Sequence, residues 1–486
     1  MTADPASVER ILAAVGPVDA NGHGPAVADP TSWDGTDIAN AERFVADHAD
    51  AVRWCGPWGA WLVWDGTRWQ RDVRDQVVEL AKVTARQLAE ETATASPPGE
   101  DGAGRRARMA KAAGYQNVGR IRAMLELARS DPAIAVVPDD LDADPWMLNT
   151  TSGTIDLRTG IARAHDPADL CTKVTRTGWD PAAAAPTWHA FLQRILPDPD
   201  VRSFVQAALG YGCTGIIADH VLCVAWGAGA NGKSTLLDAV AQVLGDYAQA
   251  APPELIAPAH DEHPTLMADL QGARLVVTSE LDDGRRLAEA TVKRLTGGDP
   301  VKARFMRQDL FEFRPTWHLW LATNHRPRIA GTDHAIWRRL RLIPFTVTVP
   351  DDEQDRHLPA KLAAEAPGIL AWLVAGCAAW RAAGSLPSPL AVTIATDDYR
   401  AAQDALGAFF TDRCHLDPAA TSAAADLYRA YKSWADETGE RTLSQGRFGE
   451  ALTERGLEPY RTRIARRWKG IGLTGDAMTR VTGESV

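Results

Sequence analysis

The stretch "GAGANGKST", Gly227 to Thr235, constrains the fold of this chain most strongly. It follows the apolar run "VLCVAW" and precedes the helix-like run "LLDAVAQVLG". Its spacing matches G-x-x-x-x-G-K-S, in which the backbone N–H groups of a strand–loop–helix unit surround a phosphate. The stretch therefore predicts an α/β fold with a central parallel sheet and flanking helices. The residues predicted to bind a nucleotide are Gly227, Ala228, Gly229, Ala230, Asn231, Gly232, Lys233, Ser234 and Thr235.

Two side chains of this loop have predicted chemical roles. Lys233 is expected to contact the β- and γ-phosphates of ATP, and Ser234 is expected to ligate magnesium. The alternative interpretation is an ordinary glycine-rich turn. The strand-like segment before the loop and the helix-like segment after it favour nucleotide binding.

Hydrolysis requires a carboxylate beside the metal and the attacking water. The segment "ARLVVTSELDD" supplies one, because Arg274 to Thr278 reads as a short strand and Glu280 stands just past its C-terminal end. Ligands collect at that edge of open α/β sheets. Glu280 is therefore the predicted catalytic acid and a second magnesium ligand, with a solvated loop acid as the alternative. The spacing leaves open whether Asp282 or Asp283 shares the metal.

Further candidates follow along the chain. The strand-like "WHLWLAT" ends at Thr323 and is followed by Asn324, whose amide is predicted to orient the attacking water. Arg338 and Arg339 in "WRRLRLIPF" are predicted to deliver a guanidinium to the γ-phosphate, which contributes about 10³ to 10⁵ in rate in other phosphoryl-transfer enzymes. Which arginine acts is open, and surface ion pairs are the alternative. If the pair works in a neighbour's site, the protein must be an oligomer.

Charge is unevenly distributed along the chain. The formal net charge is -11, yet Lys293 to Phe345 holds 11 Lys/Arg against 4 Asp/Glu, and Arg441 to Lys469 holds 8 against 3. Binding of a polyanion depends on local patches rather than on net charge. These two basic islands are compatible with nucleic-acid contact, and a solvated arginine-rich face is the alternative.

Composition predicts a soluble, cytoplasmic protein without a membrane span. It is 45% hydrophobic and 24% charged, and we find no long apolar run and no leader of the secretory type. The six cysteines form no C-x-x-C pair, which argues against a zinc cluster and a disulfide framework. The stretch "HDEH" at 260–263 lacks a helical frame and a third ligand, so it is not predicted to bind a metal.

The chain is long enough for about three domains. Residues 1–36 read as a flexible leader and "WGAWLVWDGTRWQRD" as a tryptophan-rich hairpin with a two-residue turn at Asp65-Gly66. The predicted units are an N-terminal α+β domain at 37–150, a helical connector at 151–205, the ATPase core at 206–350, a helical spacer at 351–389 and a helix–helix–basic-hairpin unit at 390–486, which is the order of a winged-helix domain.

The series "GAGANGKST", "VVTSE", "VKRLTGGDPVKARF", "LATNHRPRI" and "WRRLRLIPF" resembles the core of superfamily 3 helicases of the phage, plasmid and poxvirus-type primase-helicase family. The resemblance extends over roughly residues 40 to 475. It implies an AAA+ ATPase that assembles as a homo-hexameric ring, uses ATP and magnesium, and unwinds DNA during replication. We expect a helicase without its own primase domain, with a separate primase as a possible partner.

The resemblance also assigns residues. Lys233 and Ser234 match the Walker A pair, Glu280 the Walker B acid, Asn324 sensor 1, and Arg338 or Arg339 the arginine finger. Lys293 lies in a segment similar to the family's motif between Walker B and sensor 1. Lys302 and Arg304 lie in the segment similar to its DNA-contacting hairpin. Many family members have two adjacent acids where this chain has Ser279-Glu280. The resemblance therefore leaves open which residue binds the metal and which acts as general base.

The C-terminal basic island would lie on the wing of the winged-helix unit. A role against duplex DNA is one hypothesis and a protein-contacting wing is the other. The wing residues predicted to contact DNA are Arg463, Arg466, Arg467 and Lys469, with Arg461 beside them.

Three other functions stay open at this point. A remodelling ATPase would hydrolyse ATP at a rate indifferent to single-stranded DNA. A small-molecule kinase would be a monomer with a closing lid. A DNA-binding initiator would use ATP to control assembly and would unwind nothing.

Overall fold

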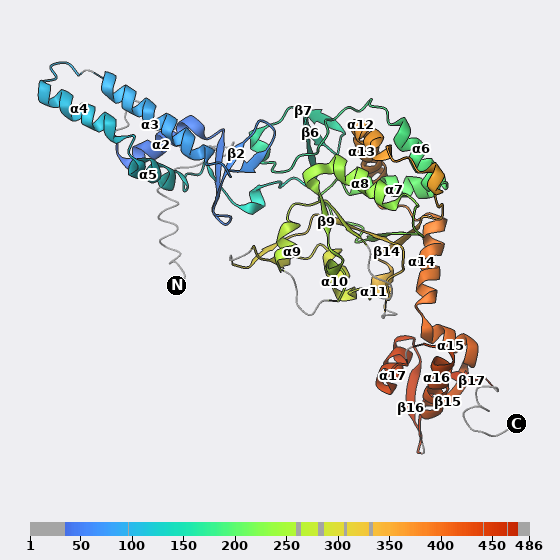
Figure 1. The fold of residues 1–486 in the computed structure, drawn as a ribbon. Coiled ribbons are helices and arrows are strands. Elements are labelled where there is room, and N and C mark those ends of the chain that lie inside the picture. Colours follow the sequence, from blue (N-terminus) through green and yellow to red (C-terminus); the bar gives the residue numbers. More distant parts are fainter. Residues whose placement is uncertain are drawn as a thin grey trace.

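The computed structural model describes residues 35–95, 97–258, 264–279, 286–305, 309–329, 334–440, 442–463 and 465–474. Nearly all of the predicted leader, the "HDEH" stretch, Glu280, Asp282 and Asp283 lie outside the described residues. Figure 1 shows a central body, an N-terminal domain on one side of it and a C-terminal unit on the other.

The body is built on a sheet whose described strands are all parallel and follow the order β14-β8-β13-β10-β9. Its strands read as nearly continuous apolar runs, as expected for a sheet that is buried on both faces. In β13 every residue is buried. The strands are β8 (Leu222–Trp226), β9 (Ala248–Ala251), β10 (Leu275–Ser279), β13 (His318–Thr323) and β14 (Leu340–Pro344).

Alternate residues of the sheet enter two separate cores. In β8, Cys223 packs with the first core, whereas Leu222 and Val224 pack with the second. Helices covering the first face include α6 (Pro186–Ile195), α7 (Pro199–Tyr211), α8 (Lys233–Leu244), α12 (Leu358–Ala364) and α13 (Ala366–Ala383). Elements on the second face include η5 (Pro253–Leu255), α9 (Pro264–Asp269), α10 (Glu289–Leu295), α11 (His334–Trp337) and α14 (Leu390–Ala402). The predicted parallel sheet with flanking helices is thus present.

Helix α13 is the one helix of the described residues that is long and apolar enough to cross a membrane, which the composition had not suggested. Half of it is buried inside the fold. Gly376 of α13 meets the backbone of Gln206 in α7, and Gly210 of α7 meets the backbone of Cys377. This contact with α7 identifies α13 as a core helix of the body.

The N-terminal domain combines a mixed sheet, in the order β3-β2-β1-β4, with four helices among the described residues. Its strands are β1 (Val52–Cys55), β2 (Ala60–Trp64), β3 (Trp69–Arg71) and β4 (Ala135–Val136). The helices are α2 (Asp37–His48), α3 (Gln76–Thr94), α4 (Gly102–Gly114) and α5 (Val118–Ala128).

The tryptophan-rich hairpin is present, but its turn is wider than predicted. Trp64 pairs with Trp69, so residues 65–68 form the loop instead of Asp65-Gly66 alone. The Asp65 carboxylate accepts from the backbone N–H groups of Thr67 at 2.7 Å and Arg68 at 2.8 Å, which satisfies the longer turn. Among the tryptophans predicted to be core, Trp69 is fully buried and Trp58, Trp61 and Trp64 are half-buried.

The segment predicted as a helical connector begins with strands. An antiparallel sheet joins β5 (Met147–Thr150), β6 (Gly153–Asp156) and β7 (Ile161–Arg163). The predicted boundary at 150 therefore divides the β5–β6 hairpin, and the boundary at 206 divides α7. The helical part of the connector is α6 and the first half of α7.

A two-stranded hairpin lies between β10 and β13 in the chain. Its strands are β11 (Val301–Ala303) and β12 (Phe311–Phe313), with Lys302 opposite Glu312. The hairpin extends away from the sheet in Figure 1, below α9 and toward the N-terminal domain.

The C-terminal unit has its own apolar core, which begins at Leu406. Helix α14 packs with the body, because Ala395 and Tyr399 join the second core of the sheet and Thr396 Oγ1 accepts from the Leu342 N–H at 3.0 Å. The junction therefore falls after α14, one helix later than predicted. The unit contains α15 (Ala405–Arg413), β15 (Cys414–Ala423), α16 (Ala424–Thr438), α17 (Gln445–Glu454), β16 (Glu458–Arg461) and β17 (Arg466–Leu473).

The close crossing of α7 and α13 gives a test of the fold. Replacing Gly210 by alanine is expected to weaken this crossing by about 1–3 kcal/mol, because the added Cβ would come within 2.5 Å of the Gly376 carbonyl carbon. Native-state hydrogen exchange of the α7 and α13 amides measures the local opening free energy. Gly446→Ala, where the added Cβ meets nothing within 4 Å, is the control. Equal protection in the two variants would contradict the packing described.

Candidate functional site

The loop after β8 has the backbone geometry of a phosphate cradle. Gly232 has φ +79° and Ala230 has φ +57°, so the chain turns through the left-handed region twice. A Cβ at Gly227 would lie 2.6 Å from Asn231 Nδ2 and collide with the Phe345 carbonyl, and one at Gly232 would lie 2.7 Å from Ile195 Cγ2. Glycine is therefore required at both positions for the loop to sit this close to its neighbours.

The Lys233 side chain fastens this loop to the neighbouring strand. Its ammonium is buried and donates to the Gly227 carbonyl at 2.7 Å, to Asn231 Oδ1 at 2.9 Å and to Asn324 Oδ1 at 3.0 Å. Asn231 also donates from Nδ2 to the Ala228 carbonyl, so it bridges two parts of the loop. Lys233 and Asn324, which were predicted separately from the sequence, are thus in direct contact.

Helix α8 starts at Lys233 with its N-terminus open to the loop. Gly232 is the N-cap and offers no side-chain cap, so the positive end of the helix dipole faces the cradle. Ser234 is exposed and Thr235 is half-buried in the first turn. A hydroxyl at the mouth of an anion cradle suits a magnesium ligand. Loop, helix end and Ser234 fit a nucleotide phosphate with its metal.

The ends of three parallel strands meet at this edge of the sheet. Trp226 pairs with Thr323, and Ala322 pairs with Ser279. Asn324 and the position after Ser279 therefore follow neighbouring strands beside the loop. Glu280, the predicted acid, is that next residue in the sequence and lies outside the described residues.

The predicted arginine finger lies at the opposite edge of the same sheet. Leu340 pairs with Leu222 at the start of β8, and the Leu222 N–H donates to the Arg339 carbonyl at 2.8 Å. Strand β8 has five residues, and each extends the chain by about 3.3 Å. The start of β8, where Arg339 is bound, therefore lies about 16 Å from the glycine loop at its other end. Arg338 is exposed, and half-buried Arg339 donates to the Ala335 carbonyl at 2.9 Å. The structure does not bring either arginine to Lys233 of the same chain.

The residues predicted to contact DNA lie on three different elements. Lys302 and Arg304 are exposed on the β11–β12 hairpin, where Lys302 Nζ is 3.8 Å from a Glu312 carboxylate oxygen. Lys293 is half-buried in α10. A separation of 3.8 Å between two exposed side chains is a weak ion pair that leaves Lys302 accessible.

The wing residues differ in how tightly they are held. Arg463, Arg466 and Lys469 are exposed, as is Arg461 beside them. Half-buried Arg467 donates to Thr421 Oγ1 at 3.1 Å and to the Thr421 carbonyl at 3.2 Å. Arg467 therefore ties β17 to β15.

One arginine beside the loop was not predicted. The Arg326 guanidinium lies 3.9 Å from the centre of the Trp226 ring, and its buried Nε has no hydrogen-bond partner among the described residues. Trp226 is the last residue before the loop, and Arg326 comes two residues after Asn324. The sequence placed Arg326 near the strand end, but only the fold shows that it stacks on Trp226.

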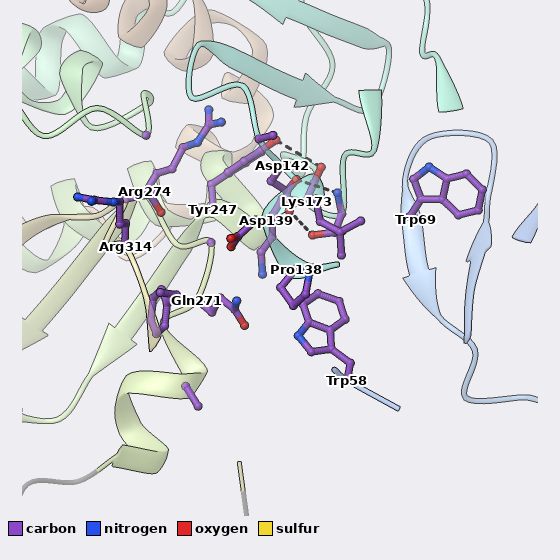
Figure 2. A pocket seen from close by; sticks show the side chains of 18 of the residues that line it. Trp58, Trp69, Pro138, Asp139, Asp142, Lys173, Tyr247, Gln271, Arg274 and Arg314 are labelled. Carbon is purple, nitrogen blue, oxygen red and sulfur yellow. Dashed lines mark hydrogen bonds between the residues drawn. The ribbon is translucent and has the colours of Figure 1, made fainter. Parts of the chain in front are cut away.

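A cavity of about 920 Å³ lies away from this loop, between the N-terminal domain and the body (Figure 2). Trp58 and Trp69 line it from one side and Lys173, Tyr247 and Arg274 from the other. Tyr247 and Arg274 precede β9 and β10, so the cavity opens at the edge of the sheet opposite to Lys233. Burial lowers the pKa of Lys173. The lining mixes acidic with basic side chains, and Arg274 is held by the carbonyls of Cys213 and Met147, both at 2.7 Å.

Metal-ligating clusters are absent from the part of the chain that the structure describes. No group of three or more His, Cys, Asp or Glu side chains there could hold an ion, and the six cysteines are buried and unbridged. Any magnesium at the loop would therefore depend on Ser234, on phosphate oxygens and on the acid expected after Ser279.

Comparison with known protein families gives matches to two segments of the chain. The family described as "D5 N terminal like" matches residues 41–197, and a family of unknown function matches residues 225–339. A "putative helicase" of Acanthamoeba polyphaga mimivirus is 29% identical over 213 residues, which are 42% of this chain and 22% of that protein. A "putative helicase" of Frog virus 3 is 27% identical over 270 residues, covering 50% and 27%. A "putative primase" of African swine fever virus is 27% identical over 211 residues, covering 41% and 22%.

These matches support a D5-like primase-helicase family for the chain, and the D5 N-terminal-like model itself covers about a third of it. The chain matches about a quarter of the length of those relatives. Among solved structures, the apo form of the NrS-1 C-terminal region gives a TM-score of 0.45 at 10% identity, covering 74% of each chain.

Two glycines of the loop, Gly227 and Gly229, give a matched pair of variants, because only Gly227 is packed closely against its neighbours. Gly227→Ala should weaken binding of a fluorescent ATP analogue by about 5- to 150-fold, because overpacking costs about 1–3 kcal/mol. Gly229→Ala is the control, since a Cβ there meets nothing within 4 Å. Equal affinity of the two variants would contradict the cradle assignment.

Proposed function

We propose that this D5-like chain is an ATP-dependent replicative DNA helicase of the superfamily 3, AAA+ type, working as a ring, with a hexamer expected from the family. The single observation that carries the proposal is the contact of Lys233 with Asn324 at the mouth of the glycine loop. It joins the residue expected to grip the triphosphate with the residue expected to sense the γ-phosphate. Each is the type of residue that phosphoryl transfer requires at that position.

The sheet supports the ATPase assignment. Its order places β8, which carries the loop, between β14 and β13, with β10 next to β13. This is the order in which the phosphate loop, the sensor residue and the metal-binding acid of AAA+ ATPases would follow neighbouring strands. Open parallel sheets bind their ligands at this edge.

The chemistry assigned to the chain's own residues is positioning and charge stabilisation. Lys233 would exchange one of its protein acceptors for a phosphate oxygen, and the loop N–H groups would hold the β-phosphate. Asn324 would orient the attacking water, and Glu280 would accept its proton. Ser234 and Glu280 would hold a magnesium ion, which neutralises charge on the β- and γ-phosphates.

The position of Arg338 and Arg339 supports action between subunits. Both arginines lie about 16 Å along β8 from the glycine loop of their own chain, so they cannot reach a nucleotide bound in that loop. In a ring, the edge of one subunit that carries them would face the loop of the next. This makes hydrolysis dependent on assembly.

The DNA contacts are proposed for the hairpin and the C-terminal unit. The β11–β12 hairpin carries Lys302 and Arg304 outward from the body, as a strand-tracking element in a central channel would. In the C-terminal unit, α15, β15, α16, α17 and the β16–β17 hairpin follow one another in the order of a winged helix. Its exposed Arg463, Arg466 and Lys469 would contact duplex phosphates.

Subunit mixing tests the arrangement of the hydrolytic site. Lys233→Ala and the double variant Arg338→Ala/Arg339→Ala should each lose ATP turnover, the latter by about 10³-fold or more. Mixing them should restore part of the turnover, because a mixed ring contains interfaces with both an intact loop and an intact arginine pair. ATPase rate against mixing ratio is the measurement. A mixture that never exceeds its separate components would refute action in trans.

The hairpin gives the test of the helicase function. Lys302→Ala/Arg304→Ala should weaken single-strand binding, reduce the slope of log K against log salt by about 1.4, and abolish unwinding of a forked duplex. Arg381→Ala/Arg400→Ala removes the same charge from exposed positions on α13 and α14 and is the control. A wild-type protein that hydrolyses ATP indifferently to DNA and unwinds no fork would favour the remodelling or initiator alternatives.

A further inference from the structure

A third basic island lies in the N-terminal domain. Residues 102–125 contain six Lys/Arg and no Asp/Glu, in a chain of net charge -11. This is the span of α4 and most of α5. Figure 1 shows α4 at the far end of the N-terminal domain from the body, beside α3.

One face of α4 is occupied by packing against α3. Gly104 and Arg108 are half-buried, and Ala112 is buried, at the i, i+4 spacing of a single helical face. Arg108 is a structural residue, because it donates to both carboxylate oxygens of Glu100, at 2.7 and 2.6 Å, and to the Thr92 carbonyl at 3.3 Å near the end of α3. Its guanidinium is not available to a ligand.

The opposite face of α4 is exposed and cationic. Arg105 and Arg106 are exposed, and neither guanidinium has a hydrogen bond or an ion pair within the described ranges. The pKa of Glu100 is lowered by its hydrogen bond with Arg108 and, to a smaller extent, by the charge of Arg105. Met109, Ala110 and Ala113 continue this face and are exposed as well. Short alanine side chains beside the two guanidinium groups would let a ligand approach the helix closely. Lys111 is exposed in the last turn.

We propose that this face of α4 binds the phosphate backbone of duplex DNA. The inference rests on the proposed helicase function, which supplies the polyanion, and adds a duplex contact on the N-terminal domain to the one proposed for the wing of the C-terminal unit. Exposed guanidinium groups match phosphates, and two arginines beside short alanine side chains suit backbone contact without requiring a particular base sequence. Because α4 stands apart from the β11–β12 hairpin, it addresses a different part of the substrate than the strand in the channel. It would hold the duplex arm of a fork.

The test compares two charge-matched double variants of the full chain. Arg105→Ala/Arg106→Ala should weaken binding of a forked duplex and lower its salt slope by about 1.8, for two lost phosphate contacts. Arg381→Ala/Arg400→Ala should leave both close to wild type. Fluorescence anisotropy of the labelled fork over a salt series gives both quantities, and circular dichroism checks that α4 still folds.

Three results decide the proposal. A loss confined to the Arg105/Arg106 variant, and larger on the fork than on a single strand, supports it. Fork affinity and salt slope equal to the control variant overturn it, as does a defect seen only in binding of an acidic protein. Single-strand-stimulated ATPase of the wild type is measured alongside. If the wild type shows stimulation while α4 proves dispensable, this inference alone fails; without stimulation, the proposed function itself fails.

Discussion

The buried ammonium of Lys233 is the interaction on which the rest of the site depends. An ammonium taken out of water costs several kcal/mol unless polar groups replace its hydration. Here the replacements are the Gly227 carbonyl and Asn231 within the loop and Asn324 at the end of β13. The lysine therefore holds the loop closed and joins it to the next strand. A phosphate oxygen could take over one acceptor position without moving the backbone far.

The parallel sheet imposes a second constraint, because it separates what ATP hydrolysis needs. The loop, Asn324 and the position after Ser279 gather at the carboxyl ends of the strands. Arg338 and Arg339 lie at the amino ends, as does the cavity shared with the N-terminal domain. Under the proposed function, one chain carries two half-sites that face different neighbours. Assembly would then be the condition for turnover, and the N-terminal domain would stand on the side of the sheet away from the nucleotide.

Local patterns allowed much of this site to be predicted. The strand–loop–helix unit around Lys233 and the strand that precedes Asn324 are both present. Each follows from hydrophobic periodicity and from glycine or capping signals within about fifteen residues. Two features that the sequence did not predict depend on contacts between residues distant in sequence: the junction after α14 and the stacking of Arg326 on Trp226. The turn at Asp65 widened because one carboxylate caps two N–H groups, which spacing alone does not reveal.

The basic face of α4 is another feature that the sequence predicts only in part. Its charges are visible in the sequence, but only the fold shows which arginines are accessible. Arg108 is bound to Glu100 and to the end of α3, whereas Arg105 and Arg106 are exposed. The family comparison places residues 41–197 in the D5 N-terminal-like region without assigning a role to α4. Charge counts therefore indicate where to look, and packing decides which residues remain available.

Electron cryo-microscopy of the purified chain with a non-hydrolysable ATP analogue and forked DNA tests the central claim most directly. The account predicts a closed ring with the analogue's phosphates in the loop at Gly227 to Lys233 and with Arg338 or Arg339 of the adjacent subunit beside the γ-phosphate. Single particles, or a ring in which the loops hold no nucleotide, would contradict it.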